Sequence, residues 1–216
     1  KYQNKEEAIK YYKMAIEKDC TKALVSYADL LSKDNGKYQN KEEAIKYYKM
    51  AIEKDCTKAL VSYADLLSKD NGKYQNKEEA IKYYKMAIEK GNEEAMNNYA
   101  LMLWKENGIP VDTKEAIRLF KMAIEKDYSP SMVNYGLMLS NGIGTQVNKN
   151  EATKLFKMAA DKNHVKGYVN YGIMLIAGHG VEMNIEEGVK YFKMAIDEGD
   201  DEAMNNYGHM LLHGSG

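Results

Sequence analysis

Apolar and polar positions along the chain follow the spacing of amphipathic helices. Near the start of the chain, Ala8, Tyr12 and Ala15 fall on one helical face, and charged side chains occupy the opposite face. A second apolar stripe follows at the same spacing and includes Leu24 and Leu31. No stretch shows the alternation that is typical of strands. The pattern therefore predicts two helices within the first 36 residues and no sheet.

This two-helix pattern recurs with a period of 36 residues over the whole chain of 216 residues. The tripeptide Lys-Met-Ala marks each period, beginning at Lys13, Lys49, Lys85, Lys121, Lys157 and Lys193. A period in this range with two helices per unit is typical of α-solenoids, in which each unit packs only on its neighbours. We expect one all-α domain over residues 1–216, a right-handed α-solenoid of helix-turn-helix units. The expected units are 1–36, 37–72, 73–108, 109–144, 145–180 and 181–216.

Residue types at fixed places in each unit predict where the helices begin, end and cross. A capping box recurs at Asn4/Glu7, Asn40/Glu43, Asn76/Glu79, Asp112/Glu115, Asn148/Glu151 and Asn184/Glu187. Residues suited to a left-handed helix end follow, at Asp19, Gly91, Asn163 and Gly199 among others. Mid-helix glycine costs about 1 kcal/mol relative to alanine, so Gly136, Gly172 and Gly208 predict close helix crossings. The recurring Met14 and Tyr27 columns are assigned to packing, either in the core or between helices.

Residues 1–36 and 37–72 are identical, and residues 73–90 repeat the first half of the unit once more. This identity indicates a recent tandem duplication or an engineered extension. The first units therefore cannot yet have specialised individually.

Composition excludes several classes of partner. The formal net charge is −1, from 31 basic and 32 acidic residues, which provides no field to hold nucleic acid or an anionic membrane. RNA recognition is disfavoured for the same reason. No apolar run approaches the roughly 20 residues of a membrane span. The chain begins at Lys1 inside a unit, so we expect a piece of a longer protein, and cytoplasmic localisation is our expectation.

Candidate chemistry is sparse. Cys20 and Cys56 occupy equivalent places in successive units, which should lie roughly 9 Å apart, too far for a disulfide, so we expect free thiols. His209 and His213 share a helix face, but two ligands are too few for a structural zinc site. No phosphate-binding loop, nucleophile motif or paired acid is present. We therefore expect no enzymatic activity, no catalytic residues, no metal and no cofactor.

The recurring residues resemble the Sel1-like repeats, relatives of the tetratricopeptide repeats. The residues that carry the resemblance are Asn206-Tyr207-Gly208, Gly142-Ile143-Gly144, Gly178-His179-Gly180-Val181 and the helix from Glu187 to Ala195. The first three units depart from the family pattern because they lack Gly-X-Gly in the turn. The resemblance implies a solenoid whose first helices line a concave groove for extended peptides.

By this resemblance, the concave positions of the first unit are Lys22, Val25, Ser26, Asp29, Ser32 and Lys33. Apolar and amide residues replace several of these polar residues in later units, a difference that core packing should not require. We therefore predict a peptide-binding groove formed by Asn98, Leu101, Trp104, Asn134, Leu137, Asn170 and Ile173, with Trp104 as a hot spot. Two other interpretations stay open: the asparagines could bond to the next unit's helix, and the apolar residues could be buried between units.

The leading functional hypothesis is a non-enzymatic protein-interaction scaffold or adaptor that binds an extended peptide or a partner protein on its concave face. One alternative is a structural spacer or a self-associating array that stacks end to end through its apolar ends. A further alternative is the docking module of a larger enzyme. Trp104 would distinguish a binding groove from a spacer, because only a groove needs it.

Overall fold

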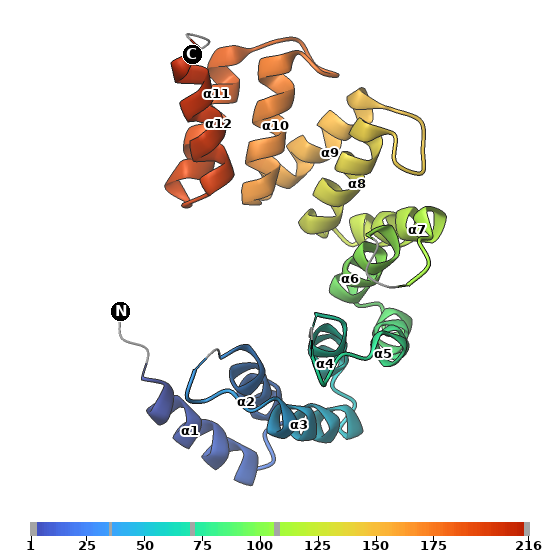
Figure 1. Cartoon of the computed structure of the whole chain (residues 1–216), viewed down its shortest axis with the longest axis vertical. Helices are drawn as coiled ribbons and strands as arrows, with labels where there is room; N and C mark the ends of the chain where they lie inside the picture. The colour runs from blue at the N-terminus through green and yellow to red at the C-terminus, as the bar shows by residue number, and fades with distance from the viewer. Residues whose placement is uncertain (1–3, 35, 70–71, 106–108, 214–216) are drawn as a thin grey trace. The chain divides into compact units, whose positions relative to one another are not determined.

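The computed structural model describes residues 4–34, 36–69, 72–105 and 109–213, which form twelve α-helices and no strand (Figure 1). In order they are α1 (Lys5–Glu17), α2 (Thr21–Lys33), α3 (Lys41–Glu53), α4 (Thr57–Lys69), α5 (Lys77–Glu89), α6 (Glu93–Trp104), α7 (Thr113–Glu125), α8 (Ser129–Asn141), α9 (Lys149–Asp161), α10 (Val165–Ala177), α11 (Ile185–Asp197) and α12 (Asp201–Leu212). The predicted all-α fold with two helices per period is confirmed.

The chain divides into two compact units, Lys1–Tyr99 and Ala100–Gly216. From here on they are called the first unit and the second unit, and the 36-residue units are called repeats. Within the first unit, α2 packs extensively on α3 and α4 packs extensively on α5. Within the second unit, α8 with α9 and α10 with α11 do the same. We call an even-numbered helix and the odd-numbered helix that follows it a helix pair. The boundaries of the six 36-residue repeats stay a prediction.

An Asn or Asp side chain begins every odd-numbered helix. Asn4 Oδ1 accepts a hydrogen bond from the Glu7 backbone amide at 3.0 Å, and the equivalent residues repeat this bond at the same distance. In α1, α3, α5 and α11 the Asn side-chain amide also donates to the carboxylate of that Glu. The first bond satisfies a backbone amide that a helix start leaves open, and the second holds the two side chains together, so the predicted N-caps are confirmed.

Residues in the left-handed conformation end the odd-numbered helices, as predicted. Their φ angles lie between 57° and 83° at Asp19, Asp55, Gly91, Asp127, Asn163 and Gly199. Three of the aspartates also link successive repeats, because each binds a lysine one repeat further along. The pairs are Lys54–Asp19 at 2.6 Å, Lys90–Asp55 at 2.6 Å and Lys162–Asp127 at 3.1 Å.

A recurring backbone hydrogen bond ties the end of each long turn to the helix before it. The amide of the capping residue donates to a leucine carbonyl of the preceding helix, as in Asn40 to Leu31 at 2.9 Å. The same bond recurs in Asn76 to Leu67, Asp112 to Leu103, Asn148 to Leu139 and Asn184 to Leu175. The start of each odd-numbered helix from α3 to α11 is thus fixed to the helix before it.

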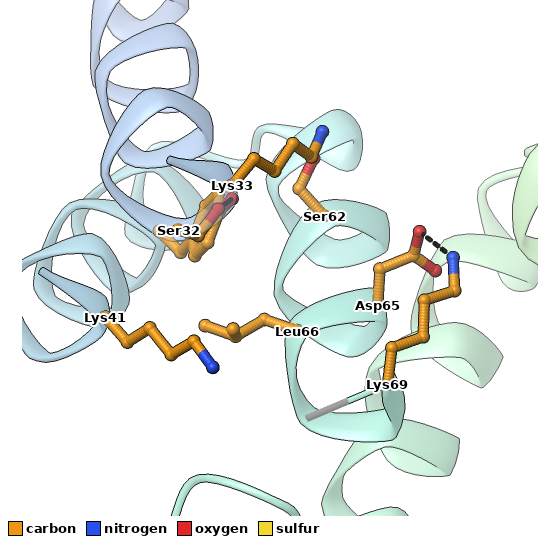
Figure 2. A pocket seen from close by; sticks show the side chains of 8 residues that line it. Ser32, Lys33, Lys41, Ser62, Asp65, Leu66 and Lys69 are labelled. Carbon is orange, nitrogen blue, oxygen red and sulfur yellow. Dashed lines mark hydrogen bonds and ion pairs between the residues drawn. The ribbon is translucent and has the colours of Figure 1, made fainter. Parts of the chain in front are cut away.

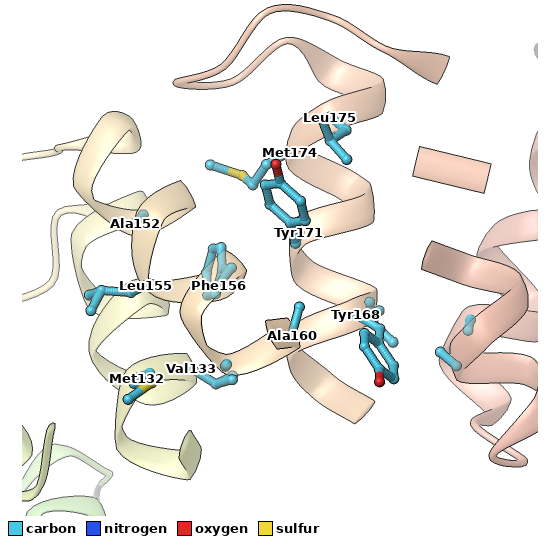
Figure 3. Packing of buried hydrophobic residues seen from close by; sticks show 14 of the residues in the cluster. Met132, Val133, Ala152, Leu155, Phe156, Ala160, Tyr168, Tyr171, Met174 and Leu175 are labelled. Atoms are coloured by element: carbon cyan, nitrogen blue, oxygen red, sulfur yellow. The ribbon is translucent and has the colours of Figure 1, made fainter. Parts of the chain in front are cut away.

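Close helix crossings form the core of the second unit, where Phe156 and its neighbours fill the space between α8, α9 and α10 (Figure 3). A Cβ added at Gly136 would lie 2.6 Å from the Phe156 ring, and one at Gly172 would lie 3.0 Å from Phe192. Two of the three predicted glycine crossings are therefore confirmed. A Cβ on Gly208 would meet nothing within 4 Å among the described residues, so the third predicted crossing is not found there.

The prediction of a packed methionine column is wrong for two of its six members, while Met50, Met86, Met122 and Met194 are half-buried and Met194 packs against the core of the second unit. Met14 is 44% exposed and Met158 is 41% exposed, whereas Tyr27 and Tyr63 of the tyrosine column are buried. The physical reason is that this methionine lies at the edge of the apolar stripe of the odd-numbered helix, and the residues at the centre of the stripe are the buried ones. Cys20 and Cys56 are free thiols. No helix among the described residues is both long enough and apolar enough to cross a membrane.

Candidate functional site

The positions predicted to line the groove lie on the even-numbered helices. Val25 and the equivalent valines of later repeats are buried: Val25 is 3% exposed, Val133 is 6% exposed and Val169 is fully buried. The expectation that they face a groove is wrong. An even-numbered helix such as α2 contacts three helices, α1, α3 and α4. These neighbours bury more of its surface than the one apolar stripe seen in its sequence.

In the first unit these positions hold a polar network. The ring of Tyr48 is buried, and its hydroxyl donates to Asp29 Oδ1 at 2.6 Å and lies 3.0 Å from the hydroxyl of Ser32. Burial, together with the hydrogen bond to Asp29, raises the pKa of Tyr48 far above its ordinary value. Lys33 completes the network with an ion pair to Asp29 at 3.4 Å.

The same network recurs one repeat later with one more member. The buried Tyr84 donates to Asp65 and lies 3.2 Å from the hydroxyl of Ser68. Asp65 also accepts from Lys69 Nζ at 2.6 Å and from Asn98 Nδ2 at 3.0 Å. Asn98, predicted as a groove residue, therefore bonds to the preceding repeat. One interpretation left open above is a bond from the asparagines to the helix of the next repeat. Asn98 bonds to the preceding repeat instead, so it contributes to packing between repeats.

A pocket of about 240 Å³ lies between α2, α3 and α4 (Figure 2). Its lining is zwitterionic, with Lys33, Lys41, Lys69 and Asp65 beside serine hydroxyls. Figure 2 shows the ion pair that joins Asp65 to Lys69 at its rim. Typical small-molecule sites occupy about 300–1,000 Å³, so this pocket has room for one side chain of a partner.

In the second unit the equivalent positions are apolar. Phe120, Phe156 and Phe192 take the place of Tyr48, and all three rings are buried. Leu101, Leu137 and Ile173 take the place of Asp29, and these three side chains are half-buried. In these helix pairs, a tyrosine at the Tyr48 position hydrogen-bonds to an aspartate at the Asp29 position. A phenylalanine at the Tyr48 position is paired with a leucine or isoleucine at the Asp29 position. The change from polar to apolar residues thus has an internal cause, and our expectation that packing would not require it is wrong.

Trp104 is half-buried at the end of α6. Its ring meets Phe120 edge-on with centroids 6.3 Å apart, and Lys105 Nζ lies 5.6 Å from the Trp104 ring centroid. Part of the indole therefore packs inside the second unit, and part faces solvent. This division suits a residue that contributes both to packing and to a contact surface.

The predicted asparagine ladder is used differently in each repeat. Asn170 Nδ2 donates to the Lys166 carbonyl of its own helix at 2.7 Å. Asn98 is engaged with Asp65, and Asn134 is half-buried with interactions of its own. Asn134, Leu137, Asn170 and Ile173 lie at equivalent positions of α8 and α10, which contact one another.

Sequence reasoning places Asp29 on the groove, but it does not predict the bonds of Asp29 and Asp65 to Tyr48 and Tyr84. The signal that could have found them is the matched change of two residues 19 positions apart, Asp with Tyr and Leu or Ile with Phe. Among the described residues, no group of three or more His, Cys, Asp or Glu side chains could hold a metal ion. His209 and His213 stack with ring centroids 6.4 Å apart.

A family model of the Sel1 repeat matches residues 2–20, 21–56, 57–92, 93–128, 129–164, 165–200 and 201–216. Each of the five full matches covers one helix pair, and the two partial matches cover α1 and α12. The comparison with curated proteins found no match.

Solved structures with the same architecture include a protective antigen of uropathogenic Escherichia coli strains that displays an SLR fold. It has a TM-score of 0.75 and 21% identity, and the alignment covers 95% of this chain but only 44% of the antigen. A Sel1 repeat protein from Oxalobacter formigenes has a TM-score of 0.78 and 22% identity, over 88% of this chain and 78% of that one. An immunity protein from Pseudomonas aeruginosa has a TM-score of 0.63 and 18% identity, over 85% of this chain and 66% of that one. At these identities the likeness shows the fold alone.

Proposed function

Because the chain belongs to the Sel1 repeat family, we propose that it is a non-enzymatic interaction scaffold that holds an extended peptide segment on its second unit. Sel1 repeat proteins generally serve as protein-interaction scaffolds. The proposed contact surface consists of Leu101, Trp104, Asn134, Leu137, Asn170 and Ile173, and we call it the groove surface. Asn98 belongs to the first unit and is engaged there.

One observation carries this proposal. Leu101, Leu137 and Ile173 are large apolar side chains at equivalent positions of successive even-numbered helices, and all three remain partly exposed. Trp104, three residues after Leu101 on α6, is also partly exposed. Partly exposed apolar anchors at one position per repeat suit a ligand that runs along the repeats in an extended conformation. Asparagine side chains beside them can donate to and accept from a peptide backbone.

The test uses the fluorescence of Trp104, which is the only Trp in the chain. A displayed library of random peptides is panned against the chain, and the affinities of enriched peptides are measured by the change in indole emission. Ile173→Ser should weaken the binding of these peptides by about 1 kcal/mol or more. Trp104→Ala, measured with labelled peptides, should weaken their binding by about 2 kcal/mol or more. Met158→Ala on α9 is the control, because Met158 is exposed outside the groove surface.

A structural spacer or a docking module with another contact surface would give a different result. A spacer would enrich no peptide. A docking module that uses another surface would enrich peptides whose affinity and indole emission do not respond to Ile173→Ser or Trp104→Ala. Either result contradicts the groove surface.

A further inference from the structure

Lys105, which directly follows α6, has lost a partner that its equivalents keep. The equivalent residues in the two preceding repeats are Lys33 and Lys69. Lys33 pairs with Asp29 at 3.4 Å, and Lys69 pairs with Asp65 at 2.6 Å. In both pairs the aspartate lies four residues earlier in the same helix, so the charge of the lysine is compensated within its own repeat.

At the end of α6 this compensation is missing. Leu101 stands four residues before Lys105, where the earlier repeats have aspartate. Among the residues that the structure describes, no carboxylate forms an ion pair with Lys105. Its exposed Nζ atom lies 5.6 Å from the centroid of the Trp104 ring instead. The indole face attracts the ammonium group but leaves its N–H donors available to an anion.

The helices that carry the rest of the groove surface hold little charge. α8 contains no Lys, Arg, Asp or Glu. The one charged residue of α10 is Lys166, which pairs with Asp200 at 3.0 Å. The residues equivalent to Lys105 on these helices are Asn141 and Ala177, so such a helix end forms without a cation. Position 105 therefore keeps a positive charge where the fold does not need one.

We propose that Lys105 and Trp104 together bind an acidic side chain of the extended segment, whose apolar residues contact Leu137 and Ile173. The indole shields one side of the ammonium group from water, which strengthens its attraction for a carboxylate. The uncharged remainder of the groove surface favours apolar and amide groups. This inference rests on the proposed function and deepens it, because it names the chemistry of the ligand: a peptide with Asp or Glu beside apolar residues.

The test uses two displayed libraries of random peptides that are identical except at one central position. That position is fixed as Glu in one library and as Lys in the other. Panning against the wild-type chain should enrich the Glu library, because a lysine would meet the like charge of Lys105. Lys105→Glu should reverse the preference and enrich the Lys library. A loss of stability cannot produce such a reversal.

Individual Glu peptides are then titrated against single variants at low and high salt. Lys105→Gln should weaken their binding about fivefold and remove most of its dependence on salt. Lys121→Gln on α7 is the matched control and should leave the affinity unchanged. Lys121 is also an exposed lysine beside an aromatic ring, 5.4 Å from the Tyr135 centroid, but it lies outside the groove surface.

The outcomes separate this inference from the groove surface itself. Equal enrichment of both libraries, with peptides that still respond to Ile173→Ser, overturns the acidic preference and leaves the groove surface standing. A Glu preference that survives Lys105→Glu, or an equal loss with Lys105→Gln and Lys121→Gln, does the same. Enrichment of neither library contradicts the groove surface as well.

Discussion

The two units build the same helix pair with two different chemistries. In the first unit a buried tyrosine hydroxyl is satisfied by an aspartate and a serine, as in Tyr48 with Asp29 and Ser32. In the second unit a buried phenylalanine needs no such partner, and leucine or isoleucine stands where the aspartate was. The comparison teaches that the two positions must change together, because a hydroxyl buried without a partner costs about 1–3 kcal/mol. A polar-to-apolar change on a repeat surface is therefore not by itself a sign of a binding site.

High pH should separate the two chemistries most strongly. Burial raises the pKa of both Tyr48 and Tyr84 well above 10, so folding favours their neutral forms. The stability that this contributes is complete below pH 10 and is lost as the pH rises toward the folded pKa, at about 1.4 kcal/mol per tyrosine and pH unit. Denaturant unfolding at pH 9 and pH 11 should show a loss of roughly 2–3 kcal/mol.

The control for this pH effect is a chain in which both networks carry the apolar pair, with Tyr48→Phe and Tyr84→Phe combined with Asp29→Leu and Asp65→Leu. It should lose clearly less stability between the two pH values. An equal loss in both proteins would show that other groups, such as lysines or Tyr63, whose pKa burial raises to about 12, cause the alkaline effect.

Changing one member of a matched pair should have the next largest effect. Asp65→Leu leaves the buried Tyr84 hydroxyl with Ser68 alone and frees Asn98 and Lys69 from their bonds. We expect a loss of about 2 kcal/mol in the free energy of unfolding. Tyr84→Phe in the same chain should recover about 1 kcal/mol or more, as measured by a double-mutant cycle. Additive effects of the two substitutions would contradict the coupling.

A smaller effect is expected from the glycines of the second unit. Gly136→Ala places a Cβ 2.6 Å from the buried ring of Phe156, so the two helices must move apart. We expect thermal unfolding to show a net loss of about 1 kcal/mol, despite the better helix propensity of alanine. Gly208→Ala is the matched control, since its Cβ meets nothing, and it should be neutral or slightly stabilising.

The smallest effect should come from the ion pairs between repeats. Lys54→Ala removes a contact with Asp19, whose side chain is 81% exposed. Exposed pairs contribute about 0.2–1 kcal/mol, and salt screens them. The loss should fall within this range at low ionic strength and disappear in about 1 M salt. A loss that persists in high salt would point to packing of the lysine stem instead.

The repeat period made the helices and their ends predictable. Asn4 and Asp19 recur at fixed places, and their roles as cap and left-handed end depend only on local backbone geometry. Which side chains are exposed was harder to predict. Whether Val25 or Met14 is buried depends on how many neighbouring helices pack on its helix, which one repeat's sequence does not reveal. The Tyr48–Asp29 bond joins residues 19 positions apart, and only a comparison of all six 36-residue repeats would have revealed it.

The backbone bond that ties the end of each long turn to the preceding helix has a consequence for how the chain can diversify. Because the amide of Asn148 is held by the Leu139 carbonyl, the start of α9 is fixed to α8. The same bond joins Asn40 to Leu31, although six of the eight intervening residues differ. These turns should therefore accept new sequences at positions other than Gly144 and Gly180, which pack closely on Thr113 and Lys149. The remaining positions are where grafted loops or epitopes can be displayed at regular intervals.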